Sequence, residues 1–341
     1  MLKTVAKLLA ALVALVVLLA AGGFVWAKTA SANRLAKVFE THKVDFPIPF
    51  PLSESEIAEL KAAKEADAGE ADKDKDVMAG VDLAAIAKER AIERGKHLVE
   101  ARYACVECHG KDFAGGTMID AAPNGTIKGM NLTLGEGGVV SKYTAADWDR
   151  IVRHGVLPDG RPAAMPSSDY FGMTDHELSD VIMYVKTFPA VNATVPKPIL
   201  GPVGTVLVAT GKLPVSAYEL PDHQAAHPVE PPKEEVTEEF GKHLLLVCTG
   251  CHRTDFSGGP IHAGDPAWPP AGNLTPHPQG LAGWTYEDFL GALRQGKRKD
   301  GTPLREPMSL MTGYADKMNE TELKAMWAYL QKVPAKPTPT E

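Results

Sequence analysis

The four cysteines of this 341-residue chain all lie in two pentapeptides of the form Cys-x-x-Cys-His. The residues concerned are Cys105, Cys108 and His109 in the first pentapeptide, and Cys248, Cys251 and His252 in the second. Two thiols one helical turn apart can form thioethers to the vinyl groups of one porphyrin, while the adjacent imidazole reaches the iron. The spacing therefore predicts two covalently bound haem c groups, with His109 and His252 as iron ligands.

Paired cysteines can also hold zinc or form a redox-active dithiol. A shared zinc site would have to bring the two pairs together across about 140 residues, and neither use explains the recurring histidine. No cysteine is left over for a disulfide or a free thiol elsewhere. Haem attachment thus accounts for all the cysteines, and it implies export, because c-type haem is attached outside the cytoplasm.

A methionine on the far side of each haem would complete the coordination of the iron. Iron held by His and Met has no open position and a raised potential, which suits electron transfer better than catalysis. Met165 lies between an Asp-Gly pair and the last apolar helix of the first half, and Met308 lies in the corresponding loop of the second half. Met311 is an alternative. The loop of the second half is longer than that of the first, and its extra residues lie in equal numbers before and after the methionine only if Met308 is the counterpart of Met165. We therefore expect Met165 and Met308 to be the distal ligands.

Two arginines occur at matched positions in the two halves, Arg153 and Arg294. A fixed guanidinium is suited to binding a haem propionate through paired hydrogen bonds, and the alternative is an ordinary arginine on a helix surface. His154 follows Arg153, but Gln295 takes its place in the second half, which argues against a shared role in iron ligation. We expect His154 to be a surface histidine or one that supports the site indirectly.

These residues belong to an internal repeat of about a hundred residues. The matched stretches are 95–98 with 241–244, 131–133 with 273–275, and 177–184 with 322–329. His97 and His243 recur on the segment leading into each pentapeptide, where a structural hydrogen bond is expected. Trp148 and Phe289 match as aromatic residues that pack on haem or core. The apolar spacing is helical and strand signals are few, so we predict an all-α fold.

The N-terminus carries an apolar run from Leu8 to Trp26 that no charge interrupts, with lysines on both sides. A run of this length can span a bilayer as a helix. A secretory signal cleaved near Ala30 is the alternative, and both export the rest of the chain. We predict a transmembrane anchor over 1–28, followed over 29–88 by an extended and helical tether whose Pro-rich stretch 46–51 acts as a stiff spacer.

Beyond the tether we predict two haem domains, named here unit 1 (89–190) and unit 2 (237–335), joined by a Pro-rich connector (191–236). The formal net charge is −7 and the isoelectric point is near 5.9, with no long basic tract. Such a chain lacks the electrostatic signature of a nucleic-acid binder. The expected partners are therefore proteins and, through the N-terminal helix, the lipid bilayer.

The order of Cys-x-x-Cys-His, Asn-Leu-Thr, Arg-x-Gly, Asp-Gly, Met and a closing helix resembles class I cytochrome c domains over roughly 200 residues. In tandem they resemble cytochrome subunits of membrane-bound alcohol and gluconate dehydrogenases, which carry three haems, and the dihaem subunit of cbb3-type oxidases. The resemblance implies a single-pass protein of the bacterial inner membrane, with its haem domains on the periplasmic side. It also implies a respiratory or photosynthetic electron conduit between a quinol- or substrate-oxidising complex and a terminal oxidase or soluble cytochrome.

A dihaem cytochrome c peroxidase is the main rival, because that family also has two such pentapeptides in a chain of similar length. A peroxidase needs one reactive haem without a methionine ligand, whereas both halves here offer one. A thiosulfate dehydrogenase would need a further cysteine as ligand. We therefore expect an electron-transfer protein rather than an enzyme.

Overall fold

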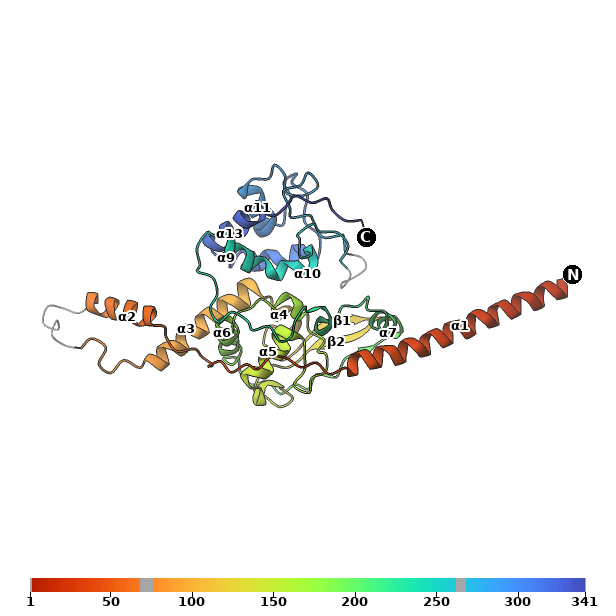
Figure 1. The fold of residues 1–341 in the computed structure, drawn as a ribbon, viewed down its shortest axis with the longest axis horizontal. Coiled ribbons are helices and arrows are strands. Elements are labelled where there is room, and N and C mark those ends of the chain that lie inside the picture. Colours follow the sequence, from red (N-terminus) through yellow and green to blue (C-terminus); the bar gives the residue numbers. More distant parts are fainter. Residues whose placement is uncertain (1, 68–75, 262–267, 341) are drawn as a thin grey trace.

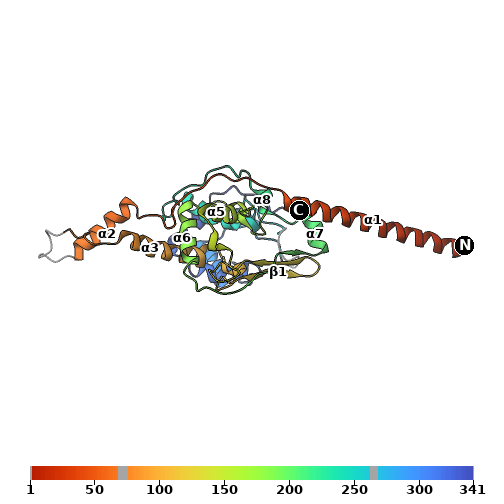
Figure 2. The same ribbon diagram turned by 90° about the horizontal axis from the view of Figure 1, so that it is seen from below.

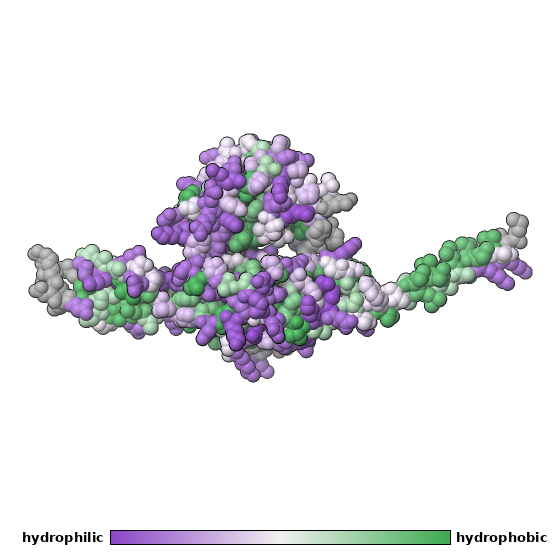
Figure 3. Space-filling model, viewed as in Figure 1, coloured by the Kyte–Doolittle hydropathy of each residue, from purple (hydrophilic) through white to green (hydrophobic). Residues whose placement is uncertain are grey.

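The computed structural model describes residues 2–67, 76–261 and 268–340. Its longest element is α1 (Leu2–Ala36), which projects alone from the rest of the chain (Figure 1). Lys3–Ala36 is long and apolar enough to cross a membrane, a test that a signal sequence near the N-terminus also passes. Its surface is continuously hydrophobic over most of its length, whereas the two units present mixed surfaces (Figure 3). Apolar side chains therefore surround this helix, and their exposure to water is unfavourable.

Beyond α1 the chain runs in extended form to α2 (Glu54–Asp67). The Pro-rich stretch predicted as a spacer lies against unit 1 instead of holding it away. Phe46 is buried in the core of unit 1, and Phe50 stacks on the His176 ring at a centroid distance of 4.7 Å. The Ser179 hydroxyl donates to the Pro47 carbonyl at 2.9 Å. Apolar aromatic residues between the prolines explain the difference, because burying them is favourable.

Unit 1 is built around its first and last helices, which pack side by side. Its helices are α3 (Leu83–His97), α4 (Val106–His109), α5 (Ala145–His154) and α6 (Asp175–Val185), with short helical turns at Leu98–Arg102, Val140–Lys142 and Ser167–Asp169. Gly95 permits the close packing, since a Cβ there would lie 2.0 Å from the Asp180 carbonyl oxygen. Phe113, Trp148, Leu178 and Ile182 form part of the buried core behind the attachment motif.

Unit 2 repeats this plan. Its helices are α9 (Glu238–Leu244), α10 (Thr249–His252), α11 (Tyr286–Gln295), α12 (Thr312–Ala315) and α13 (Glu320–Leu330), with short turns at Leu245–Cys248 and Met308–Met311. Gly241 takes the place of Gly95, and a Cβ there would lie 2.0 Å from the Ala325 carbonyl oxygen. Capping boxes begin the matched helices of both units, at Thr144/Asp147, Thr174/Glu177, Thr285/Asp288 and Asn319/Glu322. Local capping chemistry thus fixes the same helix starts in both units.

A small antiparallel sheet distinguishes unit 1 and corrects the expectation of an all-α fold. β1 (Gly116–Ala121) pairs with β2 (Gly125–Gly129), which pairs with β3 (Ile199–Leu200) of the connector. The hairpin contains β-branched Thr and Ile residues and turns at a Pro-Asn-Gly sequence, which favours strands over helix. In the matching loop of unit 2, the described residues form only an isolated bridge between Gly259 and Ala271.

The connector is ordered and packs on unit 1 and on the end of α1. It contains β3, α7 (Pro202–Ala209) and α8 (Ser216–Glu219). α7 lies beside the C-terminal part of α1 (Figure 2), and the Tyr218 hydroxyl donates to the Arg34 carbonyl at 2.8 Å. The chain after α1 also runs beside the connector, where the His42 amide donates to the His223 carbonyl at 2.8 Å. Unit 1 is therefore held against the C-terminal end of α1.

Candidate haem sites

The attachment cysteines lie on short helices at the centre of each unit. Cys105 directly precedes α4, which contains Cys108, and Cys248 and Cys251 are arranged in the same way on α10. All four thiols are unpaired, as thioether formation requires. Burial raises the pKa of Cys105 and of Cys248 to about 12, so both are protonated thiols at neutral pH.

The histidine of each motif is oriented by a backbone carbonyl. His109 Nδ1 lies 2.9 Å from the Met130 carbonyl oxygen, and His252 Nδ1 lies 2.7 Å from that of Gly272. A carbonyl can only accept, so each Nδ1 carries the proton and each Nε2 keeps its lone pair. Burial lowers the pKa of both imidazoles, which keeps them neutral. This donor chemistry fits an axial ligand of haem iron.

The Asn-Leu-Thr stretch of unit 1 holds this carbonyl in place. Asn131 is fully buried, and its Oδ1 accepts from the Thr133 amide at 2.9 Å and from the Thr133 hydroxyl at 2.8 Å. Its Nδ2 donates to the carbonyls of Val191 and Ala193 at 2.9 and 3.0 Å. The segment after α6 is thereby tied to the loop that carries the Met130 carbonyl.

Unit 2 reproduces this clamp. Asn273 Oδ1 accepts from the Thr275 amide and hydroxyl at 2.8 and 2.7 Å, and its Nδ2 donates to the Lys336 carbonyl at 2.7 Å. Sequence comparison of the halves shows that Asn-Leu-Thr recurs but gives it no role. The structure shows that it is a polar clamp behind the histidine of each attachment motif.

The candidate distal methionines lie on loops of both units. Met165 packs against the same hydrophobic core as Cys105, and its carbonyl accepts from the Ser216 hydroxyl at 2.9 Å. Met308 and Met311 occupy the two ends of one short helical turn, and both are half-buried. Ligation by Met165 and by Met308 therefore remains a prediction, as does the choice between Met308 and Met311.

The recurring arginine of unit 1 has protein partners. Arg153 is fully buried and lies 2.6 Å from Asp149 Oδ1 and 2.8 Å from Asp175 Oδ1, Nη2 to oxygen. Its Nη1 donates to the Met173 carbonyl at 3.1 Å. Asp175 is in the first turn of α6, and Met173 directly precedes the residue that caps this helix. Arg153 thus fastens α5 to the start of α6.

Arg294 makes equivalent contacts in unit 2. Its Nη2 donates to the Met318 carbonyl at 2.9 Å, and its Nη1 lies 2.9 Å from Oε1 of Glu320 in the first turn of α13. A shared structural role therefore explains why the arginine recurs. Propionate binding by Arg153 or Arg294 stays a prediction, and it would have to compete with these contacts.

Trp148 offers a different donor for a haem carboxylate. The residue is buried and packs against the Tyr143 ring at a centroid distance of 5.8 Å. Its indole Nε1 has no hydrogen-bond partner among the described residues. A buried N–H without a partner is costly, and a propionate oxygen would satisfy it. Phe289, the counterpart in unit 2, has no such donor.

The two units meet through a reciprocal pair of contacts. His97 Nε2 of unit 1 lies 2.8 Å from Glu322 Oε1 of unit 2, and His243 Nε2 of unit 2 lies 2.8 Å from Glu177 Oε1 of unit 1. Arg102 adds an ion pair with Glu322. The histidines and the glutamates are counterparts in the repeat, so the interface has approximate twofold symmetry. A structural hydrogen bond is what the sequence predicted for both histidines.

Each attachment motif lies at this interface. The Tyr314 hydroxyl of unit 2 donates to Oε1 of Glu107, which lies between the cysteines of unit 1, at 2.6 Å. Reciprocally, Asp169 of unit 1 packs on Gly250 between the cysteines of unit 2, where a Cβ would lie 2.3 Å from its Oδ1. The loop that follows each candidate distal methionine therefore covers the attachment motif of the other unit.

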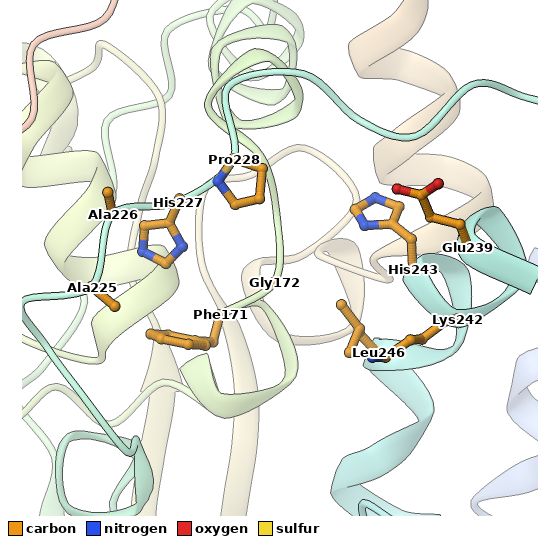
Figure 4. Close-up of a pocket in the computed structure, with 10 residues that line it drawn as sticks. All are labelled: Phe171, Gly172, Ala225, Ala226, His227, Pro228, Glu239, Lys242, His243 and Leu246. Carbon is orange, nitrogen blue, oxygen red and sulfur yellow. The ribbon is translucent and has the colours of Figure 1, made fainter. Parts of the chain in front are cut away.

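A cavity of about 280 Å³ also opens between the units. His227 and Phe171 lie on one wall, and His243 of α9 and Leu246 of the following helical turn lie on the other (Figure 4). The interface therefore contains a cavity beside His243.

Comparison with known proteins defines the class. Residues 90–185 match the family described as cytochrome C oxidase, cbb3-type, subunit III, and residues 239–334 match the family described as cytochrome c. Together with the two attachment motifs and their oriented histidines, these matches show that the chain is a c-type cytochrome.

Within this class the chain is similar to cytochrome subunits of dehydrogenases. It is 27% identical to the fructose dehydrogenase cytochrome subunit of Gluconobacter japonicus, over 74% of this chain and 54% of that protein. It is 24% identical to the gluconate 2-dehydrogenase cytochrome c subunit of Pantoea cypripedii, over 76% of this chain and 64% of that protein. A shorter match, 36% identical over 24% of this chain and 18% of the relative, is to the cytochrome c subunit of the quinone alcohol dehydrogenase of Gluconacetobacter polyoxogenes. The chain thus spans less than two thirds of the length of these relatives.

Proposed function

We propose that the chain is a dihaem electron-transfer subunit that relays electrons from a membrane dehydrogenase or quinol-oxidising complex to a terminal oxidase or a soluble cytochrome. The observation that carries this proposal is the placement of both attachment motifs at the interface between the units. Each motif is covered by the other unit, through Glu107 with Tyr314 and through Gly250 with Asp169. Such an arrangement supports a short path between two haems.

A bound haem c would supply a one-electron iron couple at each site. The residues of the chain set the conditions under which that couple works. His109 and His252 present neutral Nε2 atoms that the Met130 and Gly272 carbonyls orient. With a methionine on the opposite side, each iron would have no open position, which suits electron transfer.

α1 supports a location for this relay. We propose that α1 is a single-pass anchor in the bacterial inner membrane, with both units on the periplasmic side where c-type haem is attached. The exposed apolar surface of α1 supports a helix in lipid rather than in water. The packing of Tyr218 on Arg34 near the end of α1 would then hold unit 1 close to the bilayer.

A direct test is reduction of the haems within the native complex. Membranes containing the chain with a C-terminal affinity tag would be solubilised in mild detergent, and the co-purifying subunits identified. Fructose, gluconate and ethanol would then be added separately under argon while the reduced haem bands are followed. We expect one substrate to reduce both haems in the complex, and the chain purified without its co-purifying subunits to be reduced by none of the three.

The peroxidase alternative makes the opposite prediction. A peroxidase would turn over hydrogen peroxide with a reduced cytochrome as donor and would lack the weak long-wavelength Met-to-iron band at one haem. Peroxide turnover by the purified chain, together with no reduction by any dehydrogenase substrate, would contradict the relay.

A further inference from the structure

Four potential metal ligands converge on one side of unit 1, away from the attachment motif in sequence. They are His42 from the segment after α1, Asp149 and His154 from α5, and His227 from the connector. The three imidazole rings lie 5.0 to 5.2 Å apart, centroid to centroid, and are inclined to one another by 62 to 66°. The three rings are therefore arranged nearly evenly around one point.

The ligand atoms have the spacing of a tetrahedral zinc site. His227 Nε2 lies 3.1 Å from His154 Nε2, and Asp149 Oδ2 lies 3.3 Å from His42 Nε2 and 3.6 Å from His154 Nε2. All four ligand atoms lie within 4.8 Å of one another. Zinc with bonds of about 2.0 to 2.1 Å in tetrahedral geometry separates its ligand atoms by about 3.3 to 3.4 Å. The observed distances bracket this value.

Two buried atoms of the cluster, Asp149 Oδ2 and His42 Nε2, face each other at 3.3 Å without the angles of a regular hydrogen bond, and neither has another partner among the described residues. Arg153 occupies the other carboxylate oxygen, Oδ1, through Nε at 2.7 Å, and Asp175 balances the charge of Arg153 at 2.8 Å. A cation between Asp149 Oδ2 and His42 Nε2 would satisfy both atoms better than their present contact does.

The hydrogen bonds of the surrounding residues assign a lone pair to His154 Nε2. His223 Nε2 donates to the Ala217 carbonyl at 2.9 Å, so its Nδ1 accepts the proton of His154 Nδ1 at 3.2 Å. His154 Nε2 then has no proton. Its lone pair faces His227 Nε2 at 3.1 Å, and a cation bound to both nitrogens would take the place of the proton that this hydrogen bond requires.

We propose that His42, Asp149, His154 and His227 form a closed, four-coordinate site for a first-row divalent cation, with zinc as the best fit. Three imidazole nitrogens and one carboxylate suit zinc better than calcium or magnesium, which prefer oxygen ligands. Four protein ligands leave no open position, so the site is structural. It joins the segment after α1, helix α5 and the connector, and it is independent of the haem chemistry, since Leu290 and Gln295 replace Asp149 and His154 in unit 2.

Two cavities border the cluster. His227 lines the cavity of about 280 Å³ between the units (Figure 4), and His42 lines a second cavity of about 650 Å³ beside α5.

The test uses the full-length chain in detergent with its haems attached and without a histidine tag. After chelation and dialysis, zinc would be titrated, and bound zinc per chain would be measured by plasma mass spectrometry. We expect one tightly bound zinc ion, with an X-ray absorption spectrum at the zinc edge that shows nitrogen and oxygen ligands and no sulfur. Absence of binding, or a shell of mostly water oxygens, would overturn the proposal.

Matched variants make the test specific. His154→Gln copies the residue of unit 2 and retains much of the side-chain volume, and His227→Gln removes a ligand from the connector. We expect each to weaken zinc binding by on the order of 100-fold or more, with the haem spectra unchanged. His277→Gln in unit 2 is the control and should bind zinc like the unchanged chain. Equal zinc affinity in all three variants would contradict the site, and intact haem spectra would show that each variant is folded.

Discussion

His97 of unit 1 and Glu322 of unit 2 lie 2.8 Å apart, Nε2 to Oε1, and Glu322 also closes the capping box of α13. One carboxylate therefore stabilises both a helix start and the interface between the units. Burial raises the pKa of Glu322, but the hydrogen bond with His97 and the charge of Arg102 outweigh it, so the pKa is lowered overall.

Glu322→Gln should therefore destabilise the chain by about 2 kcal/mol at pH 7, because it removes the nearer of the two carboxylates that pair with the buried Arg102 and leaves only the longer contact with Glu177. The glutamate's folded pKa lies below its unfolded value. Its contribution is thus present above about pH 4.5 and is lost as the pH falls through the folded pKa. Denaturant unfolding at pH 7 and pH 4 should show a difference between the two proteins that shrinks in acid.

The control for this experiment is Glu320→Gln, which removes the same charge from an exposed position on the same helix. Its cost should stay below about 1 kcal/mol, as is usual for exposed ion pairs. Equal losses in the two variants would show that the contact with His97 contributes nothing beyond surface charge.

Asn131→Ala should disturb the first haem as well as the stability of unit 1. The change removes the buried acceptor of Thr133 and two donors to the segment after α6, at a cost of about 2 to 4 kcal/mol. It also frees the Met130 carbonyl that orients His109, so the potential of one haem should shift while the other is unchanged. Redox titration of both haems checks this prediction, with Asn192→Ala at an exposed position as the control. An unchanged potential of the first haem in Asn131→Ala would show that the clamp has only a structural role.

Met165→His should lower the potential of the first haem selectively, because a second imidazole replaces a thioether that raises it. Met173→Leu is a matched control in the same unit, since Met173 is buried in the core and the change conserves volume. A titration in which Met165→His resembles Met173→Leu would exclude Met165 as the ligand.

The second distal ligand can be assigned by comparing Met308→Leu with Met311→Leu. Both residues are half-buried on one helical turn, so the two changes are similar in packing. Loss of about half of the Met-to-iron charge-transfer band should accompany only the change at the ligand. We expect this for Met308; loss in Met311→Leu alone would reassign the ligand.

Asp169 should make the stability depend on pH near neutrality. Burial, followed by the charge of Glu219, raises its pKa from 3.8 to about 7. The folded state then binds this proton more tightly than the unfolded chain, so stability falls as the pH rises from about 4 to about 7. Asp169→Asn should be more stable than the unchanged chain at pH 8 by on the order of 2 to 4 kcal/mol, and similar at pH 4.

Urea unfolding across this range checks the prediction for Asp169. Asp159→Asn serves as control, because Asp159 is exposed and its hydrogen bonds from Arg161 lower its pKa. A parallel pH dependence in both variants would show that Asp169 is not the titrating group.

The parts of the site that could be predicted from sequence are those set by local spacing or by repetition. Cys105 caps the short helix that contains Cys108 and His109, so their chemistry follows from their spacing. The recurrence of His97 and His243 in both halves indicated a structural hydrogen bond for each, but it did not indicate that the partner is a glutamate of the other unit. The recurrence of Arg153 did not reveal its role. An arginine is suited both to a buried ion pair with Asp175 and to a contact with a haem propionate, so the residue type does not distinguish the two.

Features that depend on distant segments could not be predicted. His154 was expected at the surface or in support of the haem site, yet it is fully buried, because His42 and His227 approach it from 112 and 73 residues away. These partners have no counterparts in unit 2, so comparison of the halves gave no signal. The pairing of β2 with β3 could not be predicted for a similar reason, since β3 comes from the connector. The β1–β2 hairpin is local, and its Thr and Ile residues and Pro-Asn-Gly turn are a strand signal that the prediction of an all-α fold did not take into account.

The reciprocal contact between the units has the form of an interface between two copies of one protein, but here both copies belong to one chain. The connector replaces a bimolecular encounter by an intramolecular one, with an effective concentration that its length fixes. Dilution therefore cannot separate the two attachment motifs. Each molecule therefore holds its two attachment motifs together, whatever the concentration of the protein in the cell.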